Sequence, residues 1–302
     1  MKKKENILII KHGALGDLIQ ADGIFKSIRA KHKYANIVLM TSKNFVTLMK
    51  KSPYINDILI DDRLSFININ FYINFFKSIN QLNFSKIYDL QNSQRTYFYQ
   101  KYFLKKAKWV TTKREDHKIS GIMGLVEMLK KNGLETKDAL KPNISWLTTD
   151  VKNILKENKI FSKYIVLLPG SSRKHKEKRW PFFGELAKLL LLKNYQVVVI
   201  LGPEELGLEL EESMKGIIFK NMKWSELSGV MKKSYYVIGN DSGPSHIASC
   251  LNINGLALFG NSTSATRSGL KKSKFDTLEV NDLKKLSPDT VFKKMIENLK
   301  RI

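Results

Sequence analysis

The feature that most constrains the fold is an alternation of short apolar runs with helix-like segments, which continues along nearly the whole chain. Short apolar runs bounded by turn residues are typical of buried strands. The predicted strands are residues 6–10, 37–40, 57–60, 87–90, 109–111, 164–168, 196–201, 217–219, 235–238 and 255–259. The predicted helices are residues 18–31, 45–50, 64–83, 119–132, 181–192, 225–233, 247–251 and 289–300. This alternation predicts an α/β protein with parallel sheets.

The alternation is interrupted at residues 141–163, a segment with a proline, many polar residues and one short predicted helix. A chain of 302 residues also suits two medium domains better than one. We therefore predict an N-terminal domain of residues 1–155 and a C-terminal domain of residues 156–302. The last predicted helix is a candidate to pack back on the N-terminal domain.

The chain is strongly basic, with 52 Lys and Arg against 28 Asp and Glu and a formal net charge of +24. Such an excess favours acidic partners, which include nucleic acid, an anionic membrane surface and phosphorylated substrates. The composition is also rich in Lys, Asn and Ile, as in proteins of AT-rich genomes, where much of the charge is solvated surface. Composition leaves both interpretations open.

Cys250 is the only cysteine, so an intrachain disulfide is excluded. The basic residues 2–4 resemble the start of a signal peptide, but the apolar run at 7–10 is too short for one. No apolar run approaches the ~20 residues of a transmembrane helix. These features predict a cytoplasmic protein for which peripheral membrane contact is open.

The most distinctive local pattern is Gly-Asn-Asp-Ser-Gly-Pro-Ser-His at 239–246, between a predicted strand and a short predicted helix. Backbone N–H groups of this turn would point outward at the helix N-terminus, where they and the helix dipole favour an anion such as phosphate. Asp241 and His246 flank the turn and could hold hydroxyls or a second charge. The alternative is a capped turn without a ligand, because capping uses the same residue types.

A second glycine-containing loop, residues 11–17, joins the first predicted strand to the first predicted helix. Gly13, Gly16 and Gly23 are not spaced as in the dinucleotide fingerprint, and no Gly-Lys-Ser/Thr follows as in a P-loop. Two glycines between a strand and a helix instead suit a loop that faces a phosphate or another part of a substrate. Asp17 stands at the helix start, where an N-cap is the alternative to a functional carboxylate.

Two further loops after predicted strands carry candidate ligand-binding residues. In the basic run of residues 173–179, Lys178 could pair with a diphosphate. The alternatives are a solvated charge run and nucleic acid binding. The run lacks interleaved aromatic residues, which weakens the interpretation as a base-stacking nucleic acid site. Ser171 and Ser172 could donate to phosphate or cap a turn. Glu205 could accept two ribose hydroxyls or simply begin a helix.

Arg95 follows the strand 87–90, at the carboxyl end where open α/β sheets bind ligands. For His12 and His117, an ordinary polar surface position and a functional role are left equally open. The His and Asp residues lack zinc-type spacing, so we predict no metal site and no cofactor.

Together these motifs resemble glycosyltransferase family 9, the ADP-heptose:lipopolysaccharide heptosyltransferases. The matching stretches are Gly-Ala-Leu-Gly-Asp at 13–17, Asp-Leu-Gln-Asn-Ser-Gln-Arg at 89–95, Pro-Gly-Ser-Ser at 169–172, Lys-Arg-Trp-Pro at 178–181, Gly-Pro-Glu-Glu at 202–205, Asn-Asp-Ser-Gly-Pro-Ser-His at 240–246 and Leu-Phe-Gly-Asn at 258–261. Their order and spacing cover nearly the whole chain. The resemblance implies a GT-B fold, in which a cleft separates an N-terminal acceptor-binding and a C-terminal nucleotide-sugar-binding domain, both Rossmann-like.

The resemblance also implies roles for single residues. Asp17 matches the general base, which would deprotonate an acceptor hydroxyl for inverting attack on the sugar C1. Gly16 and Arg95 match acceptor positions, and Arg95 would face an anionic group. The donor positions are Ser171, Ser172 and Lys178 at the diphosphate, Glu205 at the ribose, Asp241 at the transferred sugar, Ser242, Gly243 and Pro244 at the phosphates, and His246 in the same motif. Such transfer needs no metal, because Lys178 and helix N-termini can neutralise the departing diphosphate.

The implied function is transfer of heptose from ADP-heptose to a lipopolysaccharide core acceptor, an anionic glycolipid at the inner membrane surface, with no nucleic acid partner. Gly23 stands where many relatives have a proline, the loop between residues 172 and 178 is longer and more basic, and Asn261-Ser262-Thr263 replaces a frequent Pro-Thr-Asp. The last two departures bear on the donor. The alternatives are a relative with another nucleotide sugar or glycan acceptor, a basic nucleic-acid-binding module, and an epimerase of the same fold.

Overall fold

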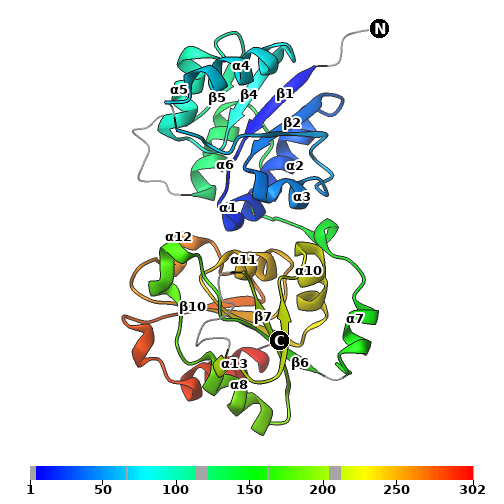
Figure 1. Ribbon diagram of the computed structural model, residues 1–302, viewed down its shortest axis with the longest axis vertical. Helices are drawn as coiled ribbons and strands as arrows, with labels where there is room; N and C mark the ends of the chain where they lie inside the picture. Colours follow the sequence, from blue (N-terminus) through cyan, green and yellow to red (C-terminus); the bar gives the residue numbers. More distant parts are fainter. Residues whose placement is uncertain (1–4, 66, 113–120, 162, 204–211, 302) are drawn as a thin grey trace. The chain divides into compact units, whose positions relative to one another are not determined.

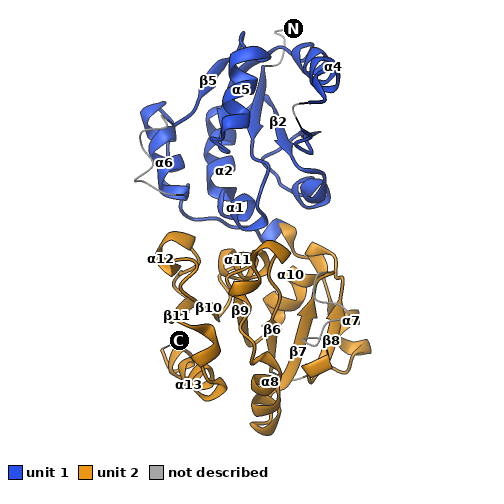
Figure 2. Cartoon of the chain, turned by 60° about the vertical axis from the view of Figure 1, so that its left-hand side comes forward, with its two compact units in different colours: residues 1–146 blue, residues 147–302 orange. Residues whose placement is uncertain are grey.

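The computed structural model describes residues 5–65, 67–112, 121–161, 163–203 and 212–301 (Figure 1). The chain forms two compact units, Met1–Trp146 and Leu147–Ile302 (Figure 2). Each unit is built on a parallel sheet whose strands alternate with helices, which confirms the predicted α/β class. The sequence placed the boundary at residue 155, and the structure divides the chain after residue 146.

Unit 1 contains a five-stranded sheet in the order β3-β2-β1-β4-β5, with every neighbouring pair parallel. The strands are β1 (Asn6–Ile10), β2 (Asn36–Thr41), β3 (Asp57–Ile60), β4 (Phe84–Asp89) and β5 (Lys108–Val110). The strand order reverses between β1 and β4. Open α/β sheets bind ligands beyond the carboxyl ends of the strands at such a reversal, which here means the loops after β1 and β4.

The helices of unit 1 are α1 (Leu15–Gln20), α2 (Asp22–Lys31), α3 (Val46–Met49), α4 (Ile69–Asn80), α5 (Gln94–Tyr102) and α6 (Ile122–Lys131), with a short 3-10 turn, η1 (Lys43–Phe45). The sequence predicted one helix where α1 and α2 lie. The helix is interrupted at Ala21, whose φ of −74° and ψ of 0° lie outside the helical region. Helix α5 was not predicted, and Ser93 begins it by accepting a hydrogen bond from the N–H of Thr96.

Helices α4 and α5 lie side by side on one face of the unit 1 sheet (Figure 1). Aromatic side chains fill the space between them, since the ring of Phe76 lies 4.7 Å from that of Tyr99 and 4.5 Å from that of Phe103. They pack on Leu8 and Ile10 of β1. The core thereby holds the β1 and β4 loops on a rigid base.

Unit 2 contains a six-stranded parallel sheet in the order β11-β10-β9-β6-β7-β8. The strands are β6 (Tyr164–Leu168), β7 (Gln196–Leu201), β8 (Ile217–Lys220), β9 (Tyr236–Asn240), β10 (Gly255–Phe259) and β11 (Phe275–Glu279). Strand β11, at the edge of the sheet, was not predicted. Here the order reverses between β6 and β9, so the predicted binding loops after these strands flank the reversal point.

The helices of unit 2 are α7 (Lys152–Glu157), α8 (Phe183–Leu192), α10 (Trp224–Lys233), α11 (Gly243–Cys250), α12 (Ala265–Ser268) and α13 (Pro288–Leu299), with 3-10 turns η3 (Ser145–Leu147, at the unit boundary), η4 (Arg173–Lys178) and η5 (Leu283–Lys285). Pro181 was predicted in the first turn of α8, but the helix begins two residues later, after the N-cap Phe182. The last helix, α13, packs against α8 in its own unit. None of the helices in the described ranges has the length and hydropathy to cross a bilayer.

Candidate active site

The turn between β9 and α11 is held in place by a buried asparagine. The Asn240 side chain donates to the carbonyl of Pro169 at 2.7 Å and accepts from the N–H of Trp180 at 3.0 Å. The Ser245 hydroxyl donates to the Asn240 carbonyl at 2.6 Å, so the first turn of α11 is tied to the end of β9. The two loops at the β6/β9 reversal are therefore locked together by hydrogen bonds.

Ser242 is the N-cap of α11, and Gly243 and Pro244 form its first helical residues. The first N–H groups of an α-helix have no acceptor within the helix, and they carry the positive end of its dipole. Because Pro244 has no N–H, anion binding at residues 242–244 would rest on the N–H groups of Ser242 and Gly243, and the assignment of a phosphate here stays a prediction.

Asp241 is the centre of a mostly buried polar cluster. Its Oδ2 lies 2.7 Å from Nζ of Lys178 and accepts a hydrogen bond from the Thr263 hydroxyl at 2.8 Å. Nε2 of His246 lies 3.9 Å from Oδ1. The side chains of Lys178 and Asp241 are 16% and 8% exposed. The structure thus brings together three of the predicted donor residues, Lys178, Asp241 and His246, and adds Thr263 from the stretch that departs from the family pattern.

The remaining predicted donor residues serve the loop itself or lie outside the described residues. The Ser171 hydroxyl donates to the carbonyl of His175 at 2.9 Å and accepts from Nε of Arg179 at 3.1 Å. Ser172 caps η4 and accepts from the N–H of Lys174 at 3.4 Å. Glu205 lies outside the described residues. Ser171 is buried, so its observed role is to shape the loop.

In unit 1, Asp17 lies in the first turn of α1, where its side chain is 59% exposed. Its Oδ2 accepts from the N–H of Ala14 at 3.2 Å and lies 3.6 Å from Nζ of the buried Lys11. Gly13 has a φ of +131°, and a side chain there would meet the ring of Phe45. Gly16 is buried within α1. The N-cap is therefore Ala14 rather than Asp17, whose carboxylate accepts the N-cap N–H from the third helical position, and its exposure leaves the carboxylate accessible.

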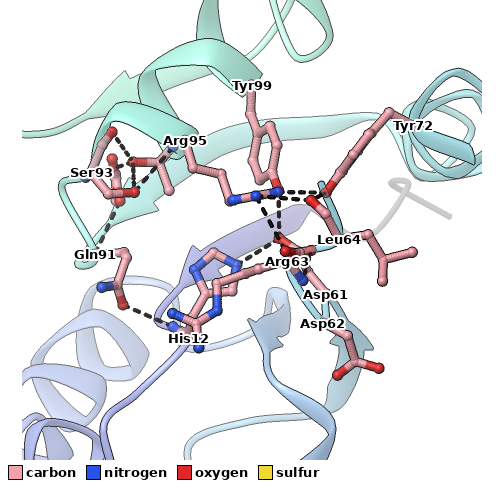
Figure 3. Close-up of polar contacts among 12 residues, drawn as sticks. His12, Asp61, Asp62, Arg63, Leu64, Tyr72, Gln91, Ser93, Arg95 and Tyr99 are labelled. Atoms are coloured by element: carbon pink, nitrogen blue, oxygen red, sulfur yellow. Dashed lines mark hydrogen bonds and ion pairs between the residues drawn. The ribbon is translucent and has the colours of Figure 1, made fainter. Parts of the chain in front are cut away.

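For His12 the structure excludes the surface alternative, because the side chain is 1% exposed. Its Nε2 donates to Oδ2 of Asp61 at 2.7 Å, and its backbone N–H donates to the side chain of Gln91 at 3.0 Å (Figure 3). The hydroxyl of Tyr99 donates to the same Asp61 oxygen at 2.7 Å. Burial would raise the pKa of Asp61, but the hydrogen bonds from His12 and Tyr99 outweigh it and lower that pKa. His117 lies outside the described residues.

Arg95 lies in the first turn of α5 rather than in a loop, and its guanidinium turns toward this cluster (Figure 3). It donates to the carbonyls of Leu64 and Arg63 at 2.9 and 3.3 Å. It also donates to the hydroxyls of Tyr72 and Tyr99, the latter at 3.2 Å. The side chain predicted to face an acceptor is therefore hydrogen-bonded to its own unit. Arg95 ties the segment after β3 to α4 and α5.

Across the ranges that the structure describes, no three His, Cys, Asp or Glu side chains are grouped so that they could hold a metal ion. In the described part of the unit 2 site, Lys178 and the N-terminus of α11 supply positive charge. Both are suited to an anionic ligand such as a phosphate.

The family model described as glycosyltransferase family 9 (heptosyltransferase) matches residues 75–296. A lipopolysaccharide heptosyltransferase 1 from Campylobacter coli is 23% identical over 291 residues, which cover 84% of this chain and 83% of that protein.

Two solved structures show the same fold over both units. A family 9 glycosyltransferase from Veillonella parvula has a TM-score of 0.80 at 17% identity and covers 100% of this chain and 99% of its own. The E. coli heptosyltransferase WaaC with ADP has a TM-score of 0.73 at 17% identity and covers 97% and 99%. The predicted GT-B fold is thereby confirmed. Because the family model matches well over half of its length, the chain belongs to glycosyltransferase family 9, the heptosyltransferases.

Proposed function

We propose that this glycosyltransferase transfers heptose from ADP-heptose to an anionic lipopolysaccharide core acceptor, with inversion at C1 and without a metal ion. The observation that carries the proposal is the Lys178–Asp241 pair beside the N-terminus of α11, at the reversal point of the unit 2 sheet. It places a cation, a helix N-terminus and a carboxylate at the position where α/β sheets bind nucleotides. Relatives support the donor, since WaaC was solved with ADP and with ADP-2-deoxy-2-fluoro heptose.

In this proposal the donor diphosphate binds against the first turn of α11 and Lys178. The bond between the sugar C1 and the phosphate oxygen breaks, and negative charge develops on the departing ADP. Lys178 and the backbone N–H groups of Ser242 and Gly243 would stabilise that charge, a role that metal ions fill in other transferases. Asp241 would accept hydrogen bonds from sugar hydroxyls, and His246 would form a further hydrogen bond with them. Glu205 would hold the ribose.

On the acceptor side, Asp17 would take the proton of the attacking hydroxyl while the new C1–oxygen bond forms. Its exposed carboxylate, held by the N–H of Ala14 and by Lys11, suits a general base that must reach a substrate. Gly16 would allow close approach at the helix start, and Arg95 would position the segment after β3. We place the reaction at the inner face of the inner membrane, where a lipid-anchored acceptor resides.

The first experiment is calorimetric titration with ADP, UDP, GDP and ADP-heptose, followed by product analysis with a core oligosaccharide acceptor. We expect ADP and ADP-heptose to bind selectively and the product to have an inverted anomeric centre. Binding of UDP or GDP compounds would keep the enzyme class and overturn the heptose assignment. A free isomer formed without acceptor would indicate an epimerase, and oligonucleotide binding without nucleotide-sugar binding would overturn the transferase proposal.

A further inference from the structure

The outer edges of α4 and α5 carry exposed apolar side chains beside the seam between the two helices. Ile69, Ile73 and Lys77 are each four residues apart on α4, so they form one stripe. Asn80, at the end of the same helix and on the same side, donates to the carbonyl of Phe103 just after α5 at 3.0 Å. The stripe therefore lies on the side of α4 that faces α5.

On α5, Arg95 and Tyr102 are seven residues apart and share a side of the helix. Because Arg95 contacts the hydroxyl and ring of Tyr72 on α4, this side of α5 is turned toward α4. Ile69, Ile73 and Tyr102 are 53%, 50% and 51% exposed. These three residues, with Lys77 and with Lys105 and Lys106 just after α5, are named the seam face.

The segment that carries the seam face is almost entirely basic in its charged residues. Residues 63–108 contain eight Lys and Arg, and the only carboxylate among them is Asp89. Asp89 is buried and accepts from the backbone N–H groups of Gln91 and Asn92. Within residues 63–108, no exposed carboxylate is therefore present to neutralise the exposed lysines. Basic side chains beside apolar and aromatic ones match an anionic lipid surface, since both the head groups and the acyl boundary find a partner.

We propose that the seam face docks the enzyme on an anionic bilayer, an inference that rests on the proposed lipid-anchored acceptor. A second copy of the chain fits this surface poorly, because two such faces would oppose lysine to lysine. Nucleic acid fits the charge, but the aliphatic side chains of Ile69 and Ile73 give no stacking platform for bases. In a bilayer, acyl chains match the apolar side chains of the seam face, and phosphate head groups match its lysines.

The test uses full-length protein and two kinds of vesicle, phosphatidylcholine alone and phosphatidylethanolamine with phosphatidylglycerol. One variant combines Ile69→Ser, Ile73→Ser and Tyr102→Ser, and a second combines Lys105→Glu and Lys106→Glu. Matched controls are Tyr34→Ser with Leu192→Ser, which are exposed elsewhere, and Lys152→Glu with Lys156→Glu on α7. All substituted side chains are exposed, so the fold should survive them.

We expect the wild-type protein to prefer phosphatidylglycerol vesicles, and each seam-face variant to lose about tenfold or more of its vesicle partitioning. The controls should lose less than about threefold. Equal binding by seam-face variants and controls, or no vesicle binding by wild type, would overturn the inference. So would variants that lose oligonucleotide binding while vesicle binding persists.

A soluble, lipid-free core oligosaccharide separates this inference from the proposed function. Seam-face variants should retain wild-type kcat/KM on the soluble acceptor and lose rate only on acceptor embedded in vesicles. An enzyme without heptose transfer would fail on both acceptors yet could still bind vesicles through the seam face. Equal loss of rate on the soluble and embedded acceptors would contradict the docking role.

Discussion

Nζ of Lys178 lies 2.7 Å from Oδ2 of Asp241, although 63 positions separate the two residues in the chain. The pair joins the loop after β6 to the turn after β9 across the reversal of the unit 2 sheet. A diphosphate bound at this point would share the lysine with Asp241. The two residues therefore form a coupled unit, although the family resemblance assigns them separate roles.

This coupling can be measured with Lys178→Met, Asp241→Asn and the double variant. Each single change removes the lysine–aspartate ion pair from a mostly buried position and should lower the free energy of unfolding by about 1–3 kcal/mol. The double variant should lose about 1–2 kcal/mol less than the sum, because neither charge is then stranded. Denaturant titration measures the free energy of unfolding of the wild type, the two single variants and the double variant. Strict additivity would mean that the contact carries no net coupling.

Lys178→Met should also weaken ADP binding by about tenfold or more, since a charge-assisted contact to the diphosphate is lost. Isothermal calorimetry measures the dissociation constant. Lys174→Met is the matched control, because Lys174 lies in the same basic run and is exposed. Equal weakening in both variants would indicate a diffuse electrostatic effect rather than a specific contact.

Asp17→Asn should reduce kcat by about 10²–10⁴-fold and leave ADP binding unchanged, because an amide cannot accept the proton of the acceptor hydroxyl. The amide oxygen can still accept the N–H of Ala14, so the melting temperature should stay close to that of wild type. Asp62→Asn is the control, an exposed carboxylate that accepts the N–H of Lys43. Retained turnover in Asp17→Asn would remove Asp17 as the base.

Asp22 should make stability depend on pH. Its carboxylate is 2% exposed and accepts from the N–H of Asn143 and Nε1 of Trp146, both at 2.9 Å. Burial raises its pKa to about 6, and the hydrogen bonds only partly oppose this. The folded state thus holds the proton more tightly than the unfolded chain does, so this contribution is fully present below about pH 4 and is lost as the pH rises through about 6.

Urea unfolding between about pH 4 and pH 7 tests this, with an expected contribution on the order of 2–3 kcal/mol from Asp22. Asp22→Asn removes the titrating group, so the difference in unfolding free energy between wild type and variant should change with pH across this range. Asp138→Asn, at an exposed partner of Lys26, should show no comparable change with pH. A constant difference for Asp22→Asn would contradict the buried titration.

Arg95→Lys distinguishes a structural role from an acceptor contact. Lysine keeps the charge but cannot reach the carbonyls of Arg63 and Leu64 and both tyrosine hydroxyls at once. If the guanidinium holds the segment after β3, the melting temperature should fall by about 3–8 °C, as for the loss of about 1–2 kcal/mol. The control is Lys101→Arg at the exposed end of the same helix. An unchanged melting temperature with a raised KM for acceptor would assign Arg95 to substrate binding.

Much of the architecture could be predicted from the sequence because its signals are local. The runs at 6–10, 57–60, 164–168, 196–201 and 255–259 match β1, β3, β6, β7 and β10 residue for residue. Except for the edge strand β3, these strands are buried on both faces, and such a strand is a continuous apolar run. Helix α5 and strand β11 were missed because α5 mixes aromatic and polar residues without a clear period and β11 is half-exposed at a sheet edge.

The sequence by itself determined the α/β class, most strand positions and the loops at which a ligand could bind, because periodicity and turn residues act within a few positions of each other. Only the tertiary structure decided what those side chains touch. It buried His12 against Asp61, hydrogen-bonded the Arg95 guanidinium to the Leu64 carbonyl of the same unit, and paired Lys178 with Asp241. Each contact spans 31 to 63 positions and depends on which strands become neighbours, a choice that long-range packing makes and that no local pattern records.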